Sequence, residues 1–268
     1  MKKKFKLGVI GAGFMSTAII NGAIDSSVIN PTDIIVSDIS DCALEKISKK
    51  GVATTLDAKF LADNCDFVLF AVKPQNLQSV LSVIANTTCN KFISIMAGVK
   101  KERIKSVLGN VFVARCMPNT PCSIGFGAVG LDLSDFTNKD DIDFVTKLLS
   151  SFATVVCLDE DKMGIVTGVS GSSPAYFYLF LKGVIDAGVK RGLSYEDAKT
   201  LAVNTMIGAG QMVIKNQDKS IDELISAVCS KGGTTIEAVK VFEQENLSEI
   251  TDKAIDACVK RSIELENL

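Results

Sequence analysis

The sequence predicts an α/β domain followed by an all-helical domain, and two observations lead to this fold class. Up to about residue 159, short apolar runs alternate with helical patterns at the spacing of strand–helix–strand units, which is typical of a parallel sheet. Beyond that point the patterns are helical, and no run predicts a strand. We therefore expect a first domain of residues 1–160 and a second domain of residues 161–268.

Each strand of the first domain is predicted by a short run rich in Val, Ile, Leu and Phe. The runs lack apolar–polar alternation, as expected for strands that are covered on both faces. Either Ser40 or Asp41 is a candidate N-cap for the second helix. The predicted strands are residues 5–10, 33–37, 66–71, 92–95, 111–114, 126–131 and 154–158, and the predicted helices are residues 15–25, 41–50, 77–85, 101–108 and 139–152.

The second domain is predicted to contain helices throughout. Residues 163–181 carry no charge over about the length of a membrane span, but Gly171, Ser172, Ser173 and Pro174 interrupt the run. We expect a buried helix, a turn and a second buried helix there, which favours a subunit interface over a membrane. The predicted helices are residues 160–170, 174–191, 195–215, 220–229, 235–245 and 248–266.

The composition excludes several kinds of chemistry. The 268 residues include no His, which removes His-dependent triads and His-ligated metals, and we expect no metal. The net charge of −2 gives no basic footprint for nucleic acid. The eight cysteines form no C-x-x-C pair and indicate reduced thiols in a cytoplasmic protein, with a Cys116/Cys122 redox pair as the alternative. Lys2, Lys3, Lys4 and Lys6 before an uncharged run imitate a signal peptide, but the glycines of that run fit a strand–turn–helix better.

A glycine-rich turn follows the first strand. Gly11, Gly13 and Ser16 form G-x-G-x-x-G with the last Gly replaced by Ser, between a strand and a helix. The first Gly permits a tight turn, and the second lets a pyrophosphate approach the amide end of the helix. The pattern predicts a Rossmann-like domain that binds a dinucleotide; an unliganded tight turn is the alternative.

Asp38 ends the second strand, where an acid usually accepts hydrogen bonds from the adenosine ribose. Two unit charges ~5 Å apart at an effective dielectric of ~20 repel by about 3 kcal/mol, roughly a hundredfold in affinity against the 2′-phosphate of NADP. We therefore favour NADH slightly over NADPH, although Lys46 lies downstream. The alternative role of Asp38 is to begin the next helix cap.

Two further loops follow strands and are expected at the cofactor groove, because ligands bind at the carboxyl ends of parallel strands. The first is residues 71–75, in which Lys73 either touches a phosphate or is solvated. The second is residues 115–121, in which Arg115 favours a salt bridge and the prolines form turns.

Five motifs in one order resemble a known family end to end. They are GAGxM, AVKPQ, MPNTP, SGSSPAYFY at residues 170–178 and SKGGTT at residues 230–235. The chain resembles pyrroline-5-carboxylate reductase, which ends proline synthesis. The resemblance implies NAD(P)H-dependent reduction of the cyclic imine 1-pyrroline-5-carboxylate to L-proline. It also implies a dinucleotide-binding first domain and a helical domain that binds substrate and dimerises, with dimers sometimes forming larger rings.

The resemblance also implies the site residues. Cofactor contacts would be Gly11, Gly13, Phe14, Met15, Ala71, Val72, Lys73 and Pro74, with Asn119 and Thr120 near the nicotinamide. The substrate site would be Ser230, Lys231, Gly232, Gly233, Thr234 and Thr235, with Thr235 hydrogen-bonded to the imine nitrogen.

The substrate loop has a physical logic of its own. Thr234 and Glu237 fit a capping box, and Gly232 and Gly233 would leave amide groups open to a carboxylate. A capped helix without a ligand is the alternative. Two residues depart from the family pattern: Lys231 stands where Pro is usual, and Ser173 where Gly is usual. We expect both to change affinity more than reaction type.

Two other functions stay open on the sequence. A β-hydroxyacid dehydrogenase would need a catalytic Lys followed four residues later by Asn, whereas Lys182 is followed by Asp186. A non-catalytic NAD(P)-sensing module would keep the glycine turn but would not need residues 232–235.

Overall fold

The computed structural model describes residues 4–266, so Lys2 and Lys3 of the basic start lie outside the described residues. Contacts divide the chain into two compact units. Unit 1 comprises residues 1–172 and 258–268, and unit 2 comprises residues 173–257. The last helix thus begins in unit 2 and ends in unit 1. The division by function expected at residue 160 stays a prediction.

One sheet of eight strands forms the centre of unit 1, in the order β3-β2-β1-β4-β5-β6-β7-β8. The first six strands are parallel, whereas β7 pairs antiparallel with β6, and β8 runs parallel to β7. Strands are added to one side of β1 up to β3 and to its other side from β4 onward, so the strand order reverses between β1 and β4. In parallel sheets such a point leaves a crevice at the carboxyl ends of the two strands. The strands are β1 (Phe5–Ile10), β2 (Ile34–Ser37), β3 (Ala53–Thr55), β4 (Cys65–Phe70), β5 (Lys91–Ser94), β6 (Phe112–Pro118), β7 (Gly127–Asp132) and β8 (Ala153–Cys157).

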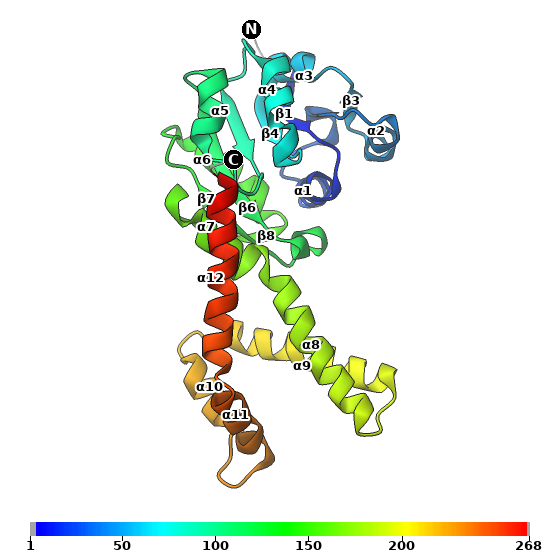
Figure 1. Cartoon of the computed structure of the whole chain (residues 1–268). Coiled ribbons are helices and arrows are strands. Elements are labelled where there is room, and N and C mark those ends of the chain that lie inside the picture. Colours follow the sequence, from blue (N-terminus) through cyan, green and yellow to red (C-terminus); the bar gives the residue numbers. More distant parts are fainter. Residues whose placement is uncertain (1–3, 267–268) are drawn as a thin grey trace. The chain divides into compact units, whose positions relative to one another are not determined.

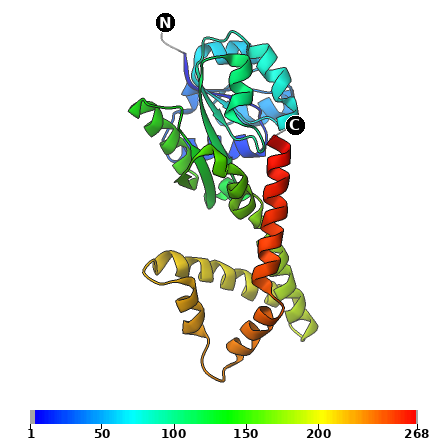
Figure 2. The ribbon, with the colours of Figure 1, turned by 60° about the vertical axis from the view of Figure 1, so that its left-hand side comes forward.

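Helices cover both faces of this sheet (Figures 1 and 2). Apolar side chains of α1, α2 and α6 pack on one face, and those of α3, α4 and α5 pack on the other. This double cover explains why β1 and β4 are buried along nearly their whole length, as their unalternating sequences predict. The helices are α1 (Phe14–Asp25), α2 (Asp41–Ser48), α3 (Ala58–Asn64), α4 (Leu77–Ile84), α5 (Lys101–Leu108) and α6 (Lys139–Ser150).

Two elements of unit 1 are absent from the sequence prediction, the strand β3 and the helix α3. β3 has three residues and ends the sheet, so it lacks the apolar run of the inner strands. α3 is short, and its N-cap Asp57 accepts a hydrogen bond from the Phe60 amide at 2.9 Å. The predicted cap of α2 is Ser40, whose hydroxyl accepts from the Ala43 amide.

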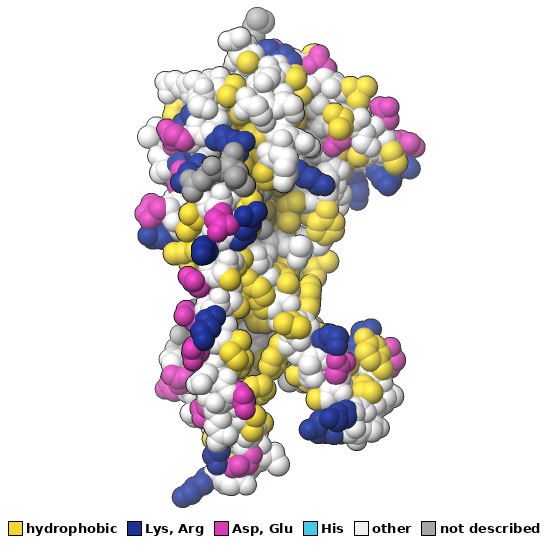
Figure 3. All heavy atoms as spheres, in the orientation of Figure 1, with side chains coloured by type: hydrophobic (Ala, Val, Ile, Leu, Met, Phe, Trp, Pro, Cys, Tyr) yellow, Lys and Arg dark blue, Asp and Glu magenta, His cyan; other side chains and the backbone are white. Residues whose placement is uncertain are grey.

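Helices make up the chain after β8, as predicted. In unit 2, α8 and α9 pack through Ile185, Ala198 and Ala202, and Figure 3 shows apolar side chains exposed among charged ones on its helices. No helix in the described range is long and apolar enough to cross a membrane. The helices are α7 (Met163–Val166), α8 (Ser173–Lys190), α9 (Tyr195–Lys215), α10 (Ile221–Val228), α11 (Thr234–Gln244) and α12 (Leu247–Glu266).

The uncharged run of residues 163–181 does break before Pro174, but it breaks through a π-helical turn. The turn spans Thr167–Gly171 and lies between α7 and α8. Its widened geometry is shown by the Ser172 amide, which donates to the Thr167 carbonyl five residues back at 2.8 Å. Single π turns inside helices occur frequently at functional sites.

Candidate active site

The glycine turn between β1 and α1 lies against the loop after β4. Gly11 has a φ of +107°, and a β-carbon there would lie 2.6 Å from the Ala71 carbonyl oxygen. The Gly11 amide donates to the Ser37 carbonyl at 2.7 Å, and the Ala71 amide donates to the Ile10 carbonyl at 2.9 Å. Position 11 therefore requires glycine both for its backbone angle and for the close approach of the two loops.

The amide end of α1 is open. Its N-cap is Gly13, which has no side chain to cap the helix, and a β-carbon at Gly13 would meet nothing within 4 Å. Phe14 is 64% exposed beside it, and Met15 is half-buried. Ser16, at the third position of the motif, is buried and donates to the Gly13 carbonyl at 3.0 Å. Free amides and a helix dipole at an uncovered turn favour the binding of an anion.

Asp38 connects this turn to the start of α2. One carboxylate oxygen accepts from the Ala12 amide at 2.7 Å, and the other accepts from the Ser40 amide at 2.9 Å. The structure thus assigns Asp38 a structural part in the turn that leads to α2, close to the alternative that the sequence left open. The contact of Asp38 with a ribose stays a prediction.

A polar pocket of about 300 Å³ borders the same corner, between α1 and α2. Ala12 and Thr17 line it on one side, and Ser40, Lys46 and Lys50 on the other. The sequence indicated Lys46 alone; Lys50, which lies in the turn after the end of α2, has no motif that predicts it.

The loop after β4 lies at the other side of the crevice. Ala71 and Val72 are half-buried, and Lys73 is exposed as the residue before a short 3₁₀ turn that begins with Pro74. Lys73 makes no ion pair within residues 4–266, so its charge is available to an anion at the carboxyl end of the sheet.

The loop after β6 is held by the side chain of Asn119. Its Oδ1 accepts from the Ala128 amide of β7 at 3.0 Å, and its Nδ2 lies 3.4 Å from both the carbonyl oxygen and the hydroxyl of Ser170 in the π turn. Thr120, the next residue, is exposed and begins the 3₁₀ turn η3 (Thr120–Ile124), which packs against α1. Ser170 was not singled out in the sequence; Pro174, four residues later, was the signal that its carbonyl lacks a helical donor.

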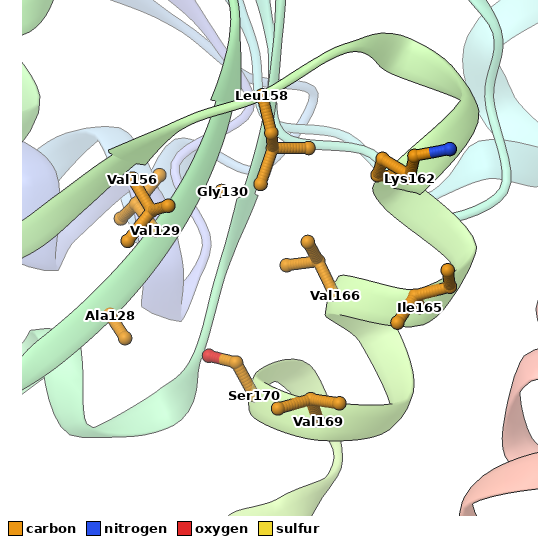
Figure 4. A pocket seen from close by; sticks show the side chains of 10 residues that line it. All are labelled: Ala128, Val129, Gly130, Val156, Leu158, Lys162, Ile165, Val166, Val169 and Ser170. Carbon is orange, nitrogen blue, oxygen red and sulfur yellow. The ribbon is translucent and has the colours of Figure 1, made fainter.

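An apolar pocket of about 390 Å³ borders the π turn on its other side (Figure 4). β7 and β8 form one wall with Ala128 and Val156, and α7 and the π turn form the other with Ile165, Val169 and Ser170.

Arg115 forms a salt bridge, as predicted from the sequence. Its buried guanidinium lies 3.1 Å from Glu160 and 2.5 Å from Glu266, near the end of α12. Lys101 is buried beside it in the fold, 2.6 Å from Asp132 and 3.1 Å from Asp135. Burial opposes the charge of Lys101, but hydrogen bonds to the two carboxylates outweigh it and raise the Lys101 pKa. Because the charges of Arg115 and Lys101 are paired with carboxylates, we assign both residues a structural role and not a catalytic one.

The predicted substrate loop lies in unit 2, whereas the cofactor residues lie in unit 1. Gly232 has a φ of +73°, and the Gly233 amide donates to the Ser230 carbonyl at 2.9 Å in a tight turn. A β-carbon at Gly233 would lie 2.3 Å from the Ser230 hydroxyl. Lys231 is exposed at the tip.

The predicted capping box at the start of α11 is wrong. The helix begins one residue earlier, so that Gly233 is its N-cap and Thr234 its first residue, and Glu237 binds Lys240 at 2.7 Å instead. The tight Ser230–Gly233 turn brings glycine to the cap position, and no side chain caps the helix. The amides of Thr234 and Thr235 therefore face outward without a side-chain cap, which favours an anion site more than the predicted box would. The Thr235 hydroxyl makes no hydrogen bond within the described residues.

The remaining chemical groups suggest no second site. Within the described chain no cluster of His, Cys, Asp or Glu could hold a metal ion. Cys116 and Cys122 are free buried thiols, and burial raises the pKa of both, which disfavours their thiolates. Lys182, considered for a dehydrogenase, is exposed on α8 and pairs with Asp186.

Comparison with known proteins identifies the class first. Residues 6–98 match the family model described as NADP oxidoreductase, coenzyme F420-dependent. Together with the parallel sheet and the open glycine turn, this match defines a dinucleotide-dependent oxidoreductase. Residues 160–265 match the model for pyrroline-5-carboxylate reductase dimerisation.

Full-length relatives then identify the family. The pyrroline-5-carboxylate reductases of Haemophilus influenzae and Staphylococcus aureus are each 35% identical to this chain, over 98% of both proteins. The chain belongs to the pyrroline-5-carboxylate reductase family. A Coxiella burnetii reductase structure matches with a TM-score of 0.89 and 33% identity over 99% of both chains. A Plasmodium falciparum reductase with NADP bound matches with a TM-score of 0.87 and 29% identity, over 99% of this chain and 100% of that one.

Proposed function

We propose that this chain reduces the cyclic imine 1-pyrroline-5-carboxylate to L-proline with NADH or NADPH, the last step of proline synthesis. The proposal is supported by the full-length similarity to reductases of that name. The structural observation that carries it is the uncapped amide end of α11, which presents donors for a small carboxylate. Beside it stands the Thr235 hydroxyl, which makes no hydrogen bond to any of residues 4–266.

The residues of unit 1 fit a nicotinamide dinucleotide. Gly11 and Gly13 leave room where β-carbons would stand, and the amides at the start of α1 would hold the pyrophosphate. The side chains of Phe14 and Lys73 are exposed in the two loops that would contact the cofactor. When bound, the reduced nicotinamide would supply a hydride to the carbon of the C=N bond.

The residues of unit 2 would bind and orient the imine. The amides of Thr234 and Thr235 would hold the carboxylate, with the charge of Lys231 nearby. The Thr235 hydroxyl oxygen would accept a hydrogen bond from the protonated imine nitrogen. As the new C–H bond forms, the π electrons of C=N move to nitrogen and leave a neutral amine. An imine that arrives protonated needs no acid from the protein, which is consistent with a chain that has no His.

Variants at Thr235 test this assignment. Thr235→Ala removes the hydroxyl but keeps the backbone amide, so we expect kcat/KM for the imine to fall by roughly tenfold to a hundredfold, the value of a hydrogen bond to a charged group. Thr235→Ser should restore most of the rate, and the Kd for cofactor should not change in either variant. A Thr235→Ala enzyme with unchanged kcat and KM would remove Thr235 from the mechanism.

We further propose that NADH is preferred to NADPH, because the Asp38 carboxylate at the ribose position would repel a 2′-phosphate. Lys46 and Lys50 line the adjoining pocket and act against this preference. Asp38→Asn should shift the ratio of kcat/KM with NADPH to that with NADH toward NADPH. The ratio is the proper readout, because any damage to the Ala12 contact affects both cofactors alike. An unchanged ratio would contradict the assignment.

We also propose that the protein acts in the cytoplasm as a dimer and that its dimers assemble into a larger ring. The match to a dimerisation model supports self-association, as do Phe177, Tyr178 and Leu179 of α8, which are each more than half exposed. The free cysteines are consistent with a reducing compartment. Light scattering tests the assembly, and a monomeric mass would contradict it.

A further inference from the structure

The π turn between α7 and α8 exposes a backbone carbonyl that an unbroken helix would cover. In an α-helix the Ser170 carbonyl would accept from the amide four residues later, but that residue is Pro174, which has no N–H. The side chain of Asn119 donates to this carbonyl and to the Ser170 hydroxyl, at 3.4 Å each. Pro174 therefore leaves the Ser170 carbonyl without a helical donor, and Asn119 supplies the donor instead.

The geometry accepts only a carboxamide at position 119. Oδ1 faces a donor, the Ala128 amide at 3.0 Å, while Nδ2 faces an acceptor, the Ser170 carbonyl. A carboxylate of the same shape would face that carbonyl with an oxygen, and an alkyl side chain would leave the Ala128 amide without this acceptor. Because both ends of the Asn119 amide are engaged with protein, this side chain is set to hold its loop rather than to bind a ligand.

The loop that Asn119 holds continues to the cofactor cradle. Asn119 is followed directly by η3, and η3 packs against α1, whose first turn is the open amide end. On its other side, Gly171 lets the π turn lie close to β6, since a β-carbon there would be 2.5 Å from the Met117 side chain. A continuous set of contacts therefore runs from the π turn through Asn119 and η3 to α1.

We propose that Asn119 is a positioning residue for hydride transfer: it sets the loop beside the nicotinamide by binding the Ser170 carbonyl that Pro174 leaves open. The inference rests on the proposed reductase function and keeps the expectation that Asn119 lies near the nicotinamide, but it gives the Asn119 side chain to the loop instead of to the cofactor. A positioning defect displaces reacting atoms without removing a ligand, so it lowers kcat more than it weakens cofactor binding.

Two variants test the hydrogen bond from Asn119 to the Ser170 carbonyl, one at the donor and one at the residue that leaves the carbonyl open. Asn119→Asp reverses the polarity that faces Ser170, and Pro174→Ala supplies an N–H that competes for the same carbonyl. For both we expect kcat to fall by about tenfold or more, while the Kd for NAD(P)H, measured by nicotinamide fluorescence, changes by less than about threefold. Pro174→Ala should also leave the melting temperature unchanged or raise it, because alanine favours a helix. Slower catalysis in a protein that is no less stable is a result that a merely structural role would not give.

The control is Ser123→Ala, which removes an exposed hydroxyl on η3 that donates to the Thr120 carbonyl at 3.0 Å. It should keep both kcat and Kd. A wild-type kcat in either Asn119→Asp or Pro174→Ala would overturn the proposal, and so would a rise in the Kd of Asn119→Asp that matches its loss of kcat/KM, which would make Asn119 a cofactor ligand. Should Asn119→Asp fail to fold, Pro174→Ala decides alone. Failure of the proposed function is a separate result, because the wild-type enzyme would then show no turnover of the imine.

Discussion

The approach of β1 to β4 at Gly11 allows a prediction whose size follows from the structure. Alanine at position 11 carries two costs: a β-carbon at a φ of +107°, about 1–2 kcal/mol, and a contact of 2.6 Å with the Ala71 carbonyl. Relieving that contact requires neighbouring central strands to separate, at the further cost of about 1–3 kcal/mol that is typical of overpacking. We therefore expect Gly11→Ala to lower the free energy of unfolding by about 2–5 kcal/mol.

Two matched variants separate these costs. Gly192→Ala has nearly the same φ, +102°, but its β-carbon meets nothing within 4 Å, so it should lose only the backbone cost. Gly13→Ala has ordinary backbone angles and open space, so it should keep its stability within about 0.5 kcal/mol. It should nevertheless bind NAD(P)H about tenfold more weakly or worse, because in the proposed site the new methyl would face the pyrophosphate.

The assay is urea unfolding at one fixed protein concentration, since self-association makes stability depend on concentration. Cofactor Kd is measured alongside by nicotinamide fluorescence. A Gly11→Ala variant that is no less stable than Gly192→Ala would contradict the close contact with Ala71, and a Gly13→Ala variant that binds cofactor as the wild type does would contradict the pyrophosphate site.

Three further predictions concern the interior of unit 1. Arg115→Leu removes a buried guanidinium from the half-buried carboxylates of Glu160 and Glu266, of which Glu266 keeps Lys100 at 3.6 Å. It should lower the free energy of unfolding by about 1–3 kcal/mol, measured by urea unfolding; a loss under about 1 kcal/mol would show that the ion pair is not buried in solution. Burial opposes ionisation of Asp135, but hydrogen bonds from two lysines and a backbone amide outweigh it and lower the Asp135 pKa. The ionised carboxylate therefore contributes to the free energy of unfolding above about pH 4, and this contribution is lost as the pH falls further. Asp135→Asn should therefore flatten the fall in stability between about pH 4 and pH 2, and an unchanged slope would contradict this. With a thiol reagent at pH 8, exposed Cys42 and Cys157 should react within the native protein while buried Cys116 stays protected; fast labelling of Cys116 would argue against its raised pKa and burial.

The order of strands and helices follows from the sequence because each inner strand is a short apolar run between breaking residues. β1, β4 and β5 are predicted within one residue for this reason. β3 was missed because an end strand has one neighbour and few buried residues, so its three residues carry no apolar signal.

The site could be predicted in its parts but not in its contacts. The glycine turn is recognisable because a tight turn and an open helix end depend on local sequence. The capping error at α11 shows the limit: Thr234 and Glu237 fit the pattern, but the preceding turn starts the helix at Gly233. The bond from Asn119 to Ser170 joins positions 51 residues apart, and local patterns contain no information about it.

The most direct test of the central claim is the initial rate of NADH and NADPH oxidation by the purified chain with 1-pyrroline-5-carboxylate, followed by nicotinamide absorbance. We expect oxidation that depends on the imine, produces L-proline in equal amount and is more efficient with NADH. Tight binding of both cofactors without oxidation dependent on the imine would contradict it and would favour a protein that senses the dinucleotide.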